Sequence, residues 1–203
     1  MEAWKLQKTR KPLLLRGARQ VGKTWLMQEF ARNEFQRSVY INFESNRNMR
    51  DVLEASLDPS QIIRAIQIET DIEIHPENTV IIFDEIQECK EALNSLKYFE
   101  ELEESFHLVG AGSLLGVTLG NFSSFPVGKV DFLELYPLTF MEFLSQKDSE
   151  MANYLESIQA IGPIPDYFFN RIFESFRLYM ISGGMPEAAK ELVESADLQR
   201  VED

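Results

Sequence analysis

The chain has 203 residues, a formal net charge of −13, a hydrophobic content of 44% and a charged content of 26%. This length accommodates one α/β domain with a small appended subdomain, and the composition is that of an ordinary globular protein. The acidic balance argues against nonspecific nucleic-acid binding, which needs a clustered basic face. No apolar run approaches the ~20 residues of a membrane span, and no signal-peptide region opens the sequence, so we expect a cytoplasmic protein.

The first predicted strand, residues 12–16, is a continuous apolar run that leads directly into the segment GARQVGKT. That segment fills every fixed position of the phosphate-binding pattern G-x-x-x-x-G-K-[ST], namely Gly17, Gly22, Lys23 and Thr24. The glycines let backbone N–H groups point inward around a phosphate, and the helix predicted after them adds the positive end of its dipole. Lys23 supplies charge for the outer phosphates, and the Thr24 hydroxyl supplies a ligand for the magnesium that bridges them.

ATP and Mg²⁺ are therefore the expected ligands of this loop. The intervening residues and the first residue beyond the pattern are expected to contact the nucleotide as well: Ala18, Arg19, Gln20, Val21 and Trp25. The alternative is a chance match in a loop that binds no nucleotide. A second motif, found later in the chain and in the right order, argues against chance.

Four further strands are predicted after the helix that begins at Lys23, and they lie at residues 38–43, 79–84, 106–110 and 130–135. Helical patterns lie between them at residues 48–69, interrupted by a new helix start at Asp58, and at residues 87–104. Strands that alternate with helices predict a P-loop NTPase fold, a five-stranded parallel sheet flanked by helices on both faces. We assign residues 1–136 to this ATPase core.

Asp84 and Glu85 form the second motif, at the carboxyl end of the fully apolar strand TVIIF. Such a strand is central in a sheet, so its end emerges beside the phosphate loop. There Asp84 can hold magnesium through water, and Glu85 can polarise a water for attack on the γ-phosphate. The alternative is a pair of acids that cap the next helix.

Ser113 follows the fourth strand in the segment GAGSLLG. If that strand lies between the first and the third, Ser113 falls where a polar side chain could contact the attacking water or the γ-phosphate. A plain turn serine is the alternative, and the sequence does not decide between the two.

Residues 137–203 are predicted to form a small carboxyl-terminal helical lid. Its expected helices lie at residues 140–146, 150–161, 166–181 and 186–198, separated by the segments GPIP and SGGMP. Three further residues with reactive or titratable side chains stand alone in the sequence and are predicted to be structural. They are Cys89, which has no second cysteine to pair with, and His75 and His107.

The segments GARQVGKT, IIFDEIQ, GAGSLLG, VGKVDFLELYPLTFMEFL and SGGMPEA together resemble a family of bacterial and archaeal ATPases. These AAA-type P-loop ATPases join the ATPase domain to a carboxyl-terminal restriction-endonuclease-like domain of unknown function. The resemblance covers nearly the whole chain, and the segments P-L-T-F-x-E-F and G-G-x-P make it specific. Because family members continue beyond Asp203, the resemblance implies an amino-terminal ATPase fragment.

The resemblance also implies roles for individual residues. Residues 17–24 would be the Walker A loop, Asp84 and Glu85 the Walker B pair, and Ser113 the sensor. Gly183, Gly184 and Pro186 would lie in the lid near the adenine. Lys129 stands where the family usually has an arginine; lysine keeps the charge but loses the planar fork suited to a phosphate.

The sequence favours an ATP-binding, magnesium-dependent ATPase that acts as a nucleotide-driven conformational switch. Two alternatives stay open: a regulatory module that binds ATP stably with negligible hydrolysis unless a partner assists, and a DNA-handling helper ATPase. A homo-oligomer or a partner protein is the expected assembly, because arginine fingers in oligomeric ATPases come from a neighbour. Arg171 and Arg177 are further candidates for such a finger.

Overall fold

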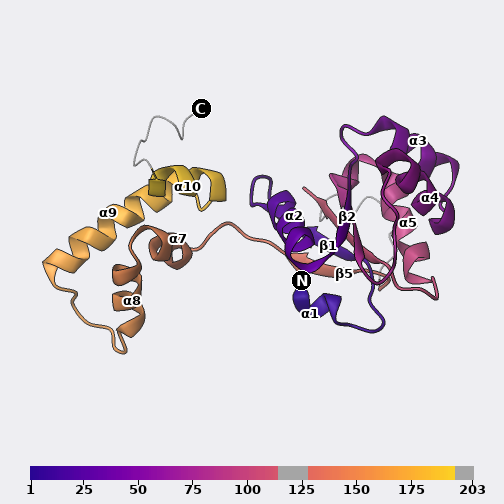
Figure 1. Cartoon of the computed structure of the whole chain (residues 1–203). Helices are drawn as coiled ribbons and strands as arrows, with labels where there is room; N and C mark the ends of the chain where they lie inside the picture. The colour runs from indigo at the N-terminus through magenta and orange to yellow at the C-terminus, as the bar shows by residue number, and fades with distance from the viewer. Residues whose placement is uncertain (114–127, 195–203) are drawn as a thin grey trace. The chain divides into compact units, whose positions relative to one another are not determined.

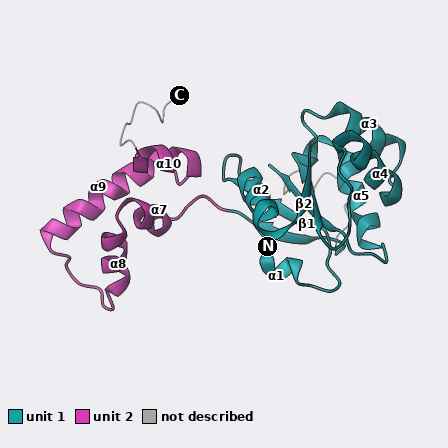
Figure 2. Ribbon diagram, in the orientation of Figure 1, with its two compact units in different colours: residues 1–135 teal, residues 136–203 magenta. Residues whose placement is uncertain are grey.

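The computed structural model describes residues 1–113 and 128–194 of the chain (Figure 1). The chain divides into two compact units, residues 1–135 and residues 136–203, shown in two colours in Figure 2. The boundary follows the last strand of the sheet, so the sheet and the carboxyl-terminal helices belong to different units.

Unit 1 is built on a five-stranded sheet in the order β2-β3-β4-β1-β5, and every neighbouring pair is parallel. Its strands are β1 (Leu13–Arg16), β2 (Arg37–Asn42), β3 (Thr79–Asp84), β4 (His107–Gly112) and β5 (Asp131–Glu134). The expected fold class, a parallel five-stranded sheet flanked by helices, is confirmed. Strand β4 lies between β3 and β1, which is the arrangement that a sensor role for Ser113 requires.

Helices cover both faces of the sheet, because its central strands are apolar on both sides. Side chains of α1 (Glu2–Lys5) and α2 (Lys23–Glu34) pack with Leu13, Leu15 and Val80 on one face. The other face, with Leu14 and Ile81, packs against α3, α4 and α5. These three helices span Arg47–Ala55, Pro59–Thr70 and Lys90–Glu100. The alternation along β1 shows that neighbouring leucines belong to opposite cores.

The prediction of one helix over residues 87–104 is wrong in its boundaries. The chain instead makes a 3₁₀ turn, η1 (Ile86–Glu88), adopts an extended conformation at Cys89, and then forms α5 only as far as Glu100. Glu85, before this turn, has a left-handed backbone with φ of 48°. The extended Cys89 separates this turn from α5, so no continuous helix runs from residue 87.

Unit 2 consists of α7 (Phe140–Lys147), α8 (Ser149–Ser157), α9 (Asp166–Ser182) and α10 (Pro186–Glu194). Helix α8 ends four residues before the predicted boundary at 161, because Ile158 turns to an extended conformation. The last helix is predicted to continue to residue 198, and the part of it beyond residue 194 lies outside the described residues. Two small apolar clusters around Phe143 and Leu144 form the core of this unit.

The two segments of unit 2 that carry the family resemblance contact each other. Thr139 and Glu142 of P-L-T-F-x-E form a capping box, in which each side chain bonds to the other residue's backbone N–H at the start of α7. Just before the box, the Leu138 N–H donates to the Gly184 carbonyl across 2.7 Å. A side chain at Gly184 would place its Cβ 2.4 Å from the Leu138 carbonyl oxygen, and the φ of Gly184 is 71°. The glycine is therefore required both by the contact and by the backbone.

None of the described helices is both long enough and apolar enough to span a membrane.

Candidate functional site

The carboxyl ends of β1, β3 and β4 lie side by side at one edge of the sheet, because the strands are parallel and adjacent. The chain after β1 forms the glycine-bounded loop and enters α2, with Gly22 as the residue before the helix. Gly22 and Gln20 both have left-handed backbones, with φ of 88° and 63°. Residues 18–20 of the loop are exposed, whereas Val21 is buried and anchors it.

Lys23 is buried, and its ammonium group is turned into the loop. The Nζ atom donates to the carbonyl oxygens of Gly17 at 3.1 Å and of Ala18 at 2.6 Å. Burial lowers the pKa of Lys23, while the charges of Glu85 and Asp84 oppose this shift. The side chain is thus already directed inward at a glycine-bounded loop on a helix N-terminus, which is the arrangement that suits an anion.

Asp84, at the end of β3, is only 2% exposed, and both of its carboxylate oxygens accept hydrogen bonds. The Thr24 hydroxyl donates to Oδ2 at 2.7 Å, and the Glu85 N–H donates to Oδ1 at 3.0 Å. A hydroxyl and a carboxylate are hard oxygen ligands of the type that Mg²⁺ prefers, directly or through water. The donor set formed by Thr24 and Asp84 therefore fits magnesium.

Tyr40 is a residue of this site that the sequence analysis missed. It lies on β2, and its hydroxyl donates to Asp84 Oδ2 at 2.7 Å. Burial, followed by the hydrogen bond to Asp84, raises the pKa of Tyr40 to about 12, so the hydroxyl keeps its proton at neutral pH. The alternation in SVYINF is the sequence signal for this placement. Val39 and Ile41 are buried in one core, so Tyr40 between them faces the other side of the sheet.

Glu85 is positioned beside Asp84 without capping the next turn. Although Glu85 precedes η1, its side chain makes no capping hydrogen bond to the described backbone. Its carboxylate instead accepts a hydrogen bond from the Gln87 amide, with Nε2 at 2.6 Å from Oε2. The capping alternative for Glu85 is therefore not what the geometry shows, and the catalytic role stays a prediction.

Ser113 follows β4 directly and is buried. Its strand lies between the strand that leads into the loop and the strand that ends in Asp84. The residue is thus at the predicted edge of the sheet, whereas its contact with a nucleotide stays a prediction.

Lys129 lies elsewhere. It precedes β5, so it is at the amino-terminal edge of a parallel sheet, opposite the phosphate loop of its own chain. Its ammonium group pairs with Glu100 at 2.7 Å and with Glu101 at 3.4 Å, and the hydrogen bond to Glu100 raises its pKa. The structure thus places Lys129 away from the phosphate loop of its own chain, and its role in phosphate chemistry stays a prediction.

The other predicted nucleotide contacts divide between the units. Trp25 is 66% exposed and lines a hollow of about 560 Å³ beside α1 and α2. Pro186 belongs to unit 2, where it lines a hollow of about 220 Å³ with Leu138 and Phe143. The contact of Pro186 with the adenine and the contact of Trp25 with the nucleotide both stay predictions.

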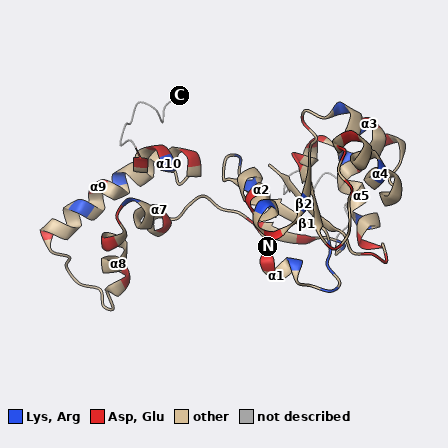
Figure 3. Cartoon of the chain, viewed as in Figure 1, with Lys and Arg blue, Asp and Glu red and all other residues tan. Residues whose placement is uncertain are grey.

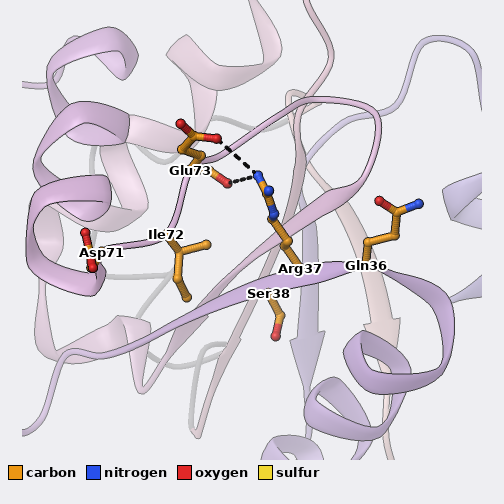
Figure 4. A pocket seen from close by; sticks show the side chains of 6 residues that line it. All are labelled: Gln36, Arg37, Ser38, Asp71, Ile72 and Glu73. Atoms are coloured by element: carbon orange, nitrogen blue, oxygen red, sulfur yellow. Dashed lines mark hydrogen bonds and ion pairs between the residues drawn. The ribbon is translucent and has the colours of Figure 1, made fainter.

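A larger hollow, of about 600 Å³, is not part of this site. It is lined by Gln36, Arg37, Ser38, Asp71, Ile72 and Glu73, and Figure 4 shows the Arg37 guanidinium reaching Glu73. Arg37 is the first residue of β2, so the hollow lies at the amino-terminal edge of the sheet. Its guanidinium is 3.5 Å from the Glu73 carboxylate, which leaves the basic group paired with an acid.

The basic segment between α1 and β1, blue in Figure 3, is partly used to hold the chain together. The Arg10 guanidinium donates to the carbonyl oxygens of Lys5 and Gln7, and to that of Ser105 near the start of β4. At least this guanidinium is therefore occupied by backbone carbonyls of its own chain.

The loop between β1 and α2, with Lys23 directed into it and Thr24 bonded to Asp84, defines a P-loop nucleotide-binding protein. The family model described as AAA domain matches residues 9–144, and the chain belongs to that family. Membership supports nucleotide-binding ATPase activity. Comparison with curated protein sequences found no match.

Solved structures show the same fold. The RuvB Holliday junction branch migration motor of Thermotoga maritima is 20% identical, with a TM-score of 0.53 over 95% of this chain and 56% of that one. A mutant of the same RuvB is 21% identical, with a TM-score of 0.55 over 100% of this chain and 60% of that one. The chain spans less than two thirds of these structures, and such identities show the fold alone.

Proposed function

We propose that the chain binds ATP with Mg²⁺ and hydrolyses it, and that hydrolysis switches the protein between conformations. The observation that carries this proposal is the hydrogen bond between Thr24 and Asp84, 2.7 Å long, which joins the two predicted motifs across 60 residues of sequence. It brings the hydroxyl and the carboxylate of the predicted magnesium site to one place, beside the buried ammonium of Lys23.

Each residue of the site has its own role. Lys23 and the N–H groups of residues 17–24 hold the phosphates, and Thr24 with Asp84 holds the metal. Magnesium, when bound, neutralises charge on the outer phosphates. Glu85 accepts the proton of the attacking water, and Ser113 orients the γ-phosphate or that water. Residues 137–203 act as a lid in which Pro186 contacts the adenine.

The direct test is thermal unfolding with and without Mg-ATP. A ligand at 100 times its dissociation constant adds about 2.7 kcal/mol to the free energy of unfolding. The wild type should therefore unfold at a higher temperature with Mg-ATP, and Lys23→Ala should lose that shift. Lys8→Ala, which removes an exposed lysine outside the loop, is the matched control and should keep it. A wild type without any shift would contradict the proposal.

A second candidate function is a module that binds ATP stably and hydrolyses it negligibly without a partner. The placement of Lys129 favours this candidate, because that residue is paired at the edge opposite the phosphate loop. The two candidates differ in the turnover rate of the isolated chain, which single-turnover hydrolysis measures.

The resemblance to ATPases with a restriction-endonuclease-like domain extends the proposal beyond Asp203. We propose that such a domain follows in the full-length protein, that the protein is cytoplasmic, and that it acts as a homo-oligomer or with a partner protein. A DNA-handling helper ATPase is the alternative for the whole protein. The net charge of −13 speaks against DNA binding by the present chain.

A further inference from the structure

Tyr40 and Thr24 donate to the same oxygen atom of Asp84. Both hydroxyl oxygens are 2.7 Å from Oδ2. The contact follows from the register of the sheet, in which Asn42 is paired with Asp84 and Tyr40 with Ile82. Ile82 packs in the core beside α2, so residues of even number on β3 face the helix that carries Thr24.

This arrangement uses the acceptor capacity of Oδ2. A carboxylate oxygen has two lone pairs, and the two hydroxyl groups engage both. Oδ1 accepts the N–H of Glu85. The Thr24 hydroxyl, the proposed magnesium ligand, contacts Oδ2. A water molecule on a metal ion held by Thr24 is a strong donor whose nearest acceptor is this oxygen, so it competes there with one of the two hydroxyls.

Of the two hydroxyls, that of Tyr40 is the one that can leave. Thr24 is needed as a magnesium ligand, and its side chain is short and fixed on the first turn of α2. Tyr40 is 38% exposed and lies on β2, an edge strand that pairs only with β3 among the described strands. Its ring therefore borders solvent, into which the hydroxyl can turn.

We propose that Tyr40 gates the magnesium site: its hydroxyl occupies Asp84 Oδ2 in the metal-free state and is displaced when hydrated magnesium binds. Tyr40 is thus a positioning residue that stabilises the metal-free form. The inference rests on the proposed function, because it assumes that Asp84 holds magnesium through water.

Tyr40→Phe is the test, since it removes the hydroxyl and keeps the ring. A fluorescent ATP analogue is titrated with magnesium, and the midpoint of magnesium-dependent binding is compared with that of the wild type. We expect the midpoint to fall about tenfold, which corresponds to about 1.4 kcal/mol, the lower end for a hydrogen bond to a charged group. The metal-free variant should also unfold at a lower temperature. A merely structural role would not improve magnesium binding.

Tyr98→Phe, the same chemical change on α5, is the matched control and should leave the midpoint unchanged. A second measurement uses the tyrosine absorption of the nucleotide-bound chain. Adding magnesium should produce a blue shift as Tyr40 loses its carboxylate partner, present in the wild type and in Tyr98→Phe and absent in Tyr40→Phe.

A midpoint that is unchanged or higher in Tyr40→Phe would overturn the inference, and so would a wild type without the blue shift. These outcomes leave the proposed function intact as long as the wild type binds the nucleotide more tightly with magnesium. A wild type in which magnesium has no effect on binding would overturn both.

Discussion

A side chain at Gly17 would collide with the backbone of Leu135, because a Cβ there would lie 2.2 Å from the Leu135 carbonyl oxygen. The Leu135 N–H donates to the Arg16 carbonyl at 2.7 Å, which continues the pairing of β1 with β5. The first glycine of the phosphate loop is thus required by the last residue of unit 1, and not only by a bound phosphate.

Gly17→Ala should therefore destabilise unit 1 even without nucleotide. The contact is with backbone, which cannot rotate away, so we expect a loss of roughly 1 to 3 kcal/mol in the free energy of unfolding. Chemical denaturation measures it. The control is Gly162→Ala, where a Cβ meets nothing within 4 Å, and the expected change stays within about 0.5 kcal/mol. Equal effects of the two substitutions would refute the argument.

Glu85→Gln should bind ATP but lose turnover, because the amide cannot accept the proton of the attacking water. A lost general base typically costs about 10² to 10⁴ in rate. Single-turnover hydrolysis and nucleotide binding are measured in parallel. Glu88→Gln, in the 3₁₀ turn that follows Glu85, is the control and should hydrolyse normally. Hydrolysis at the wild-type rate in Glu85→Gln would show that the catalytic assignment is wrong.

Asp84→Asn should differ from Glu85→Gln by weakening the binding of nucleotide itself when magnesium is present. The amide loses the charge that attracts the hydrated metal. Its NH₂ group accepts no hydrogen bond, whereas both oxygens of the Asp84 carboxylate are acceptors in the wild type. Binding titrations with magnesium and with a chelator separate the two variants. Equal magnesium dependence in Asp84→Asn and the wild type would exclude Asp84 from the metal site.

Turnover by a monomeric chain should be slow, well under the ~1 to 10³ s⁻¹ typical of enzymes. Lys129 lies at the edge opposite its own phosphate loop. An arginine finger is worth roughly 10³ to 10⁵ in rate, and lysine is a weaker substitute. The rate per subunit should therefore rise with protein concentration, and Lys129→Ala should remove the rise while Lys8→Ala keeps it. Arg171→Ala tests the alternative finger, although Arg171 is engaged with Asp148 at 2.6 Å. Fast turnover by a chain that sediments as a monomer would contradict this account.

His107 should make the fold sensitive to mild acid. It is 4% exposed, its Nδ1 is 2.9 Å from the Pro76 carbonyl oxygen, and burial lowers its pKa from 6.5 to about 4. Between these values the unfolded chain binds a proton that the folded chain does not. Stability is therefore lost as the pH falls from 6.5 to 4, by about 2 kcal/mol at pH 5.

Denaturant titrations at pH 7 and pH 5 test this prediction. His107→Asn keeps an N–H donor but cannot titrate, so its loss of stability between the two pH values should be smaller by about 2 kcal/mol. His75→Asn, at a histidine whose side chain is 48% exposed, is the control. An unchanged pH dependence in His107→Asn would assign the acid sensitivity to other groups.

The sequence by itself determined the features that depend on local chemistry. The spacing of Gly17, Gly22 and Lys23 defines a phosphate loop wherever the chain folds, because it specifies backbone freedom and one charge at fixed separations. Continuous apolar runs such as residues 79–84 identify strands covered on both faces, and their alternation with helices implies a parallel sheet. The placement of Asp84 and Glu85 at the end of such a strand follows from the same pattern.

Only the tertiary structure decided which distant residues meet. The contact of Tyr40 with Asp84 depends on the pairing of β2 with β3, and the placement of Lys129 at the opposite edge depends on the position of β5. The contact of Gly184 with Leu138 likewise depends on how two helices of unit 2 pack. Strand order and register are set by the summed burial of many side chains, which no local pattern contains, so a residue's partners across the sheet become visible only in the folded chain.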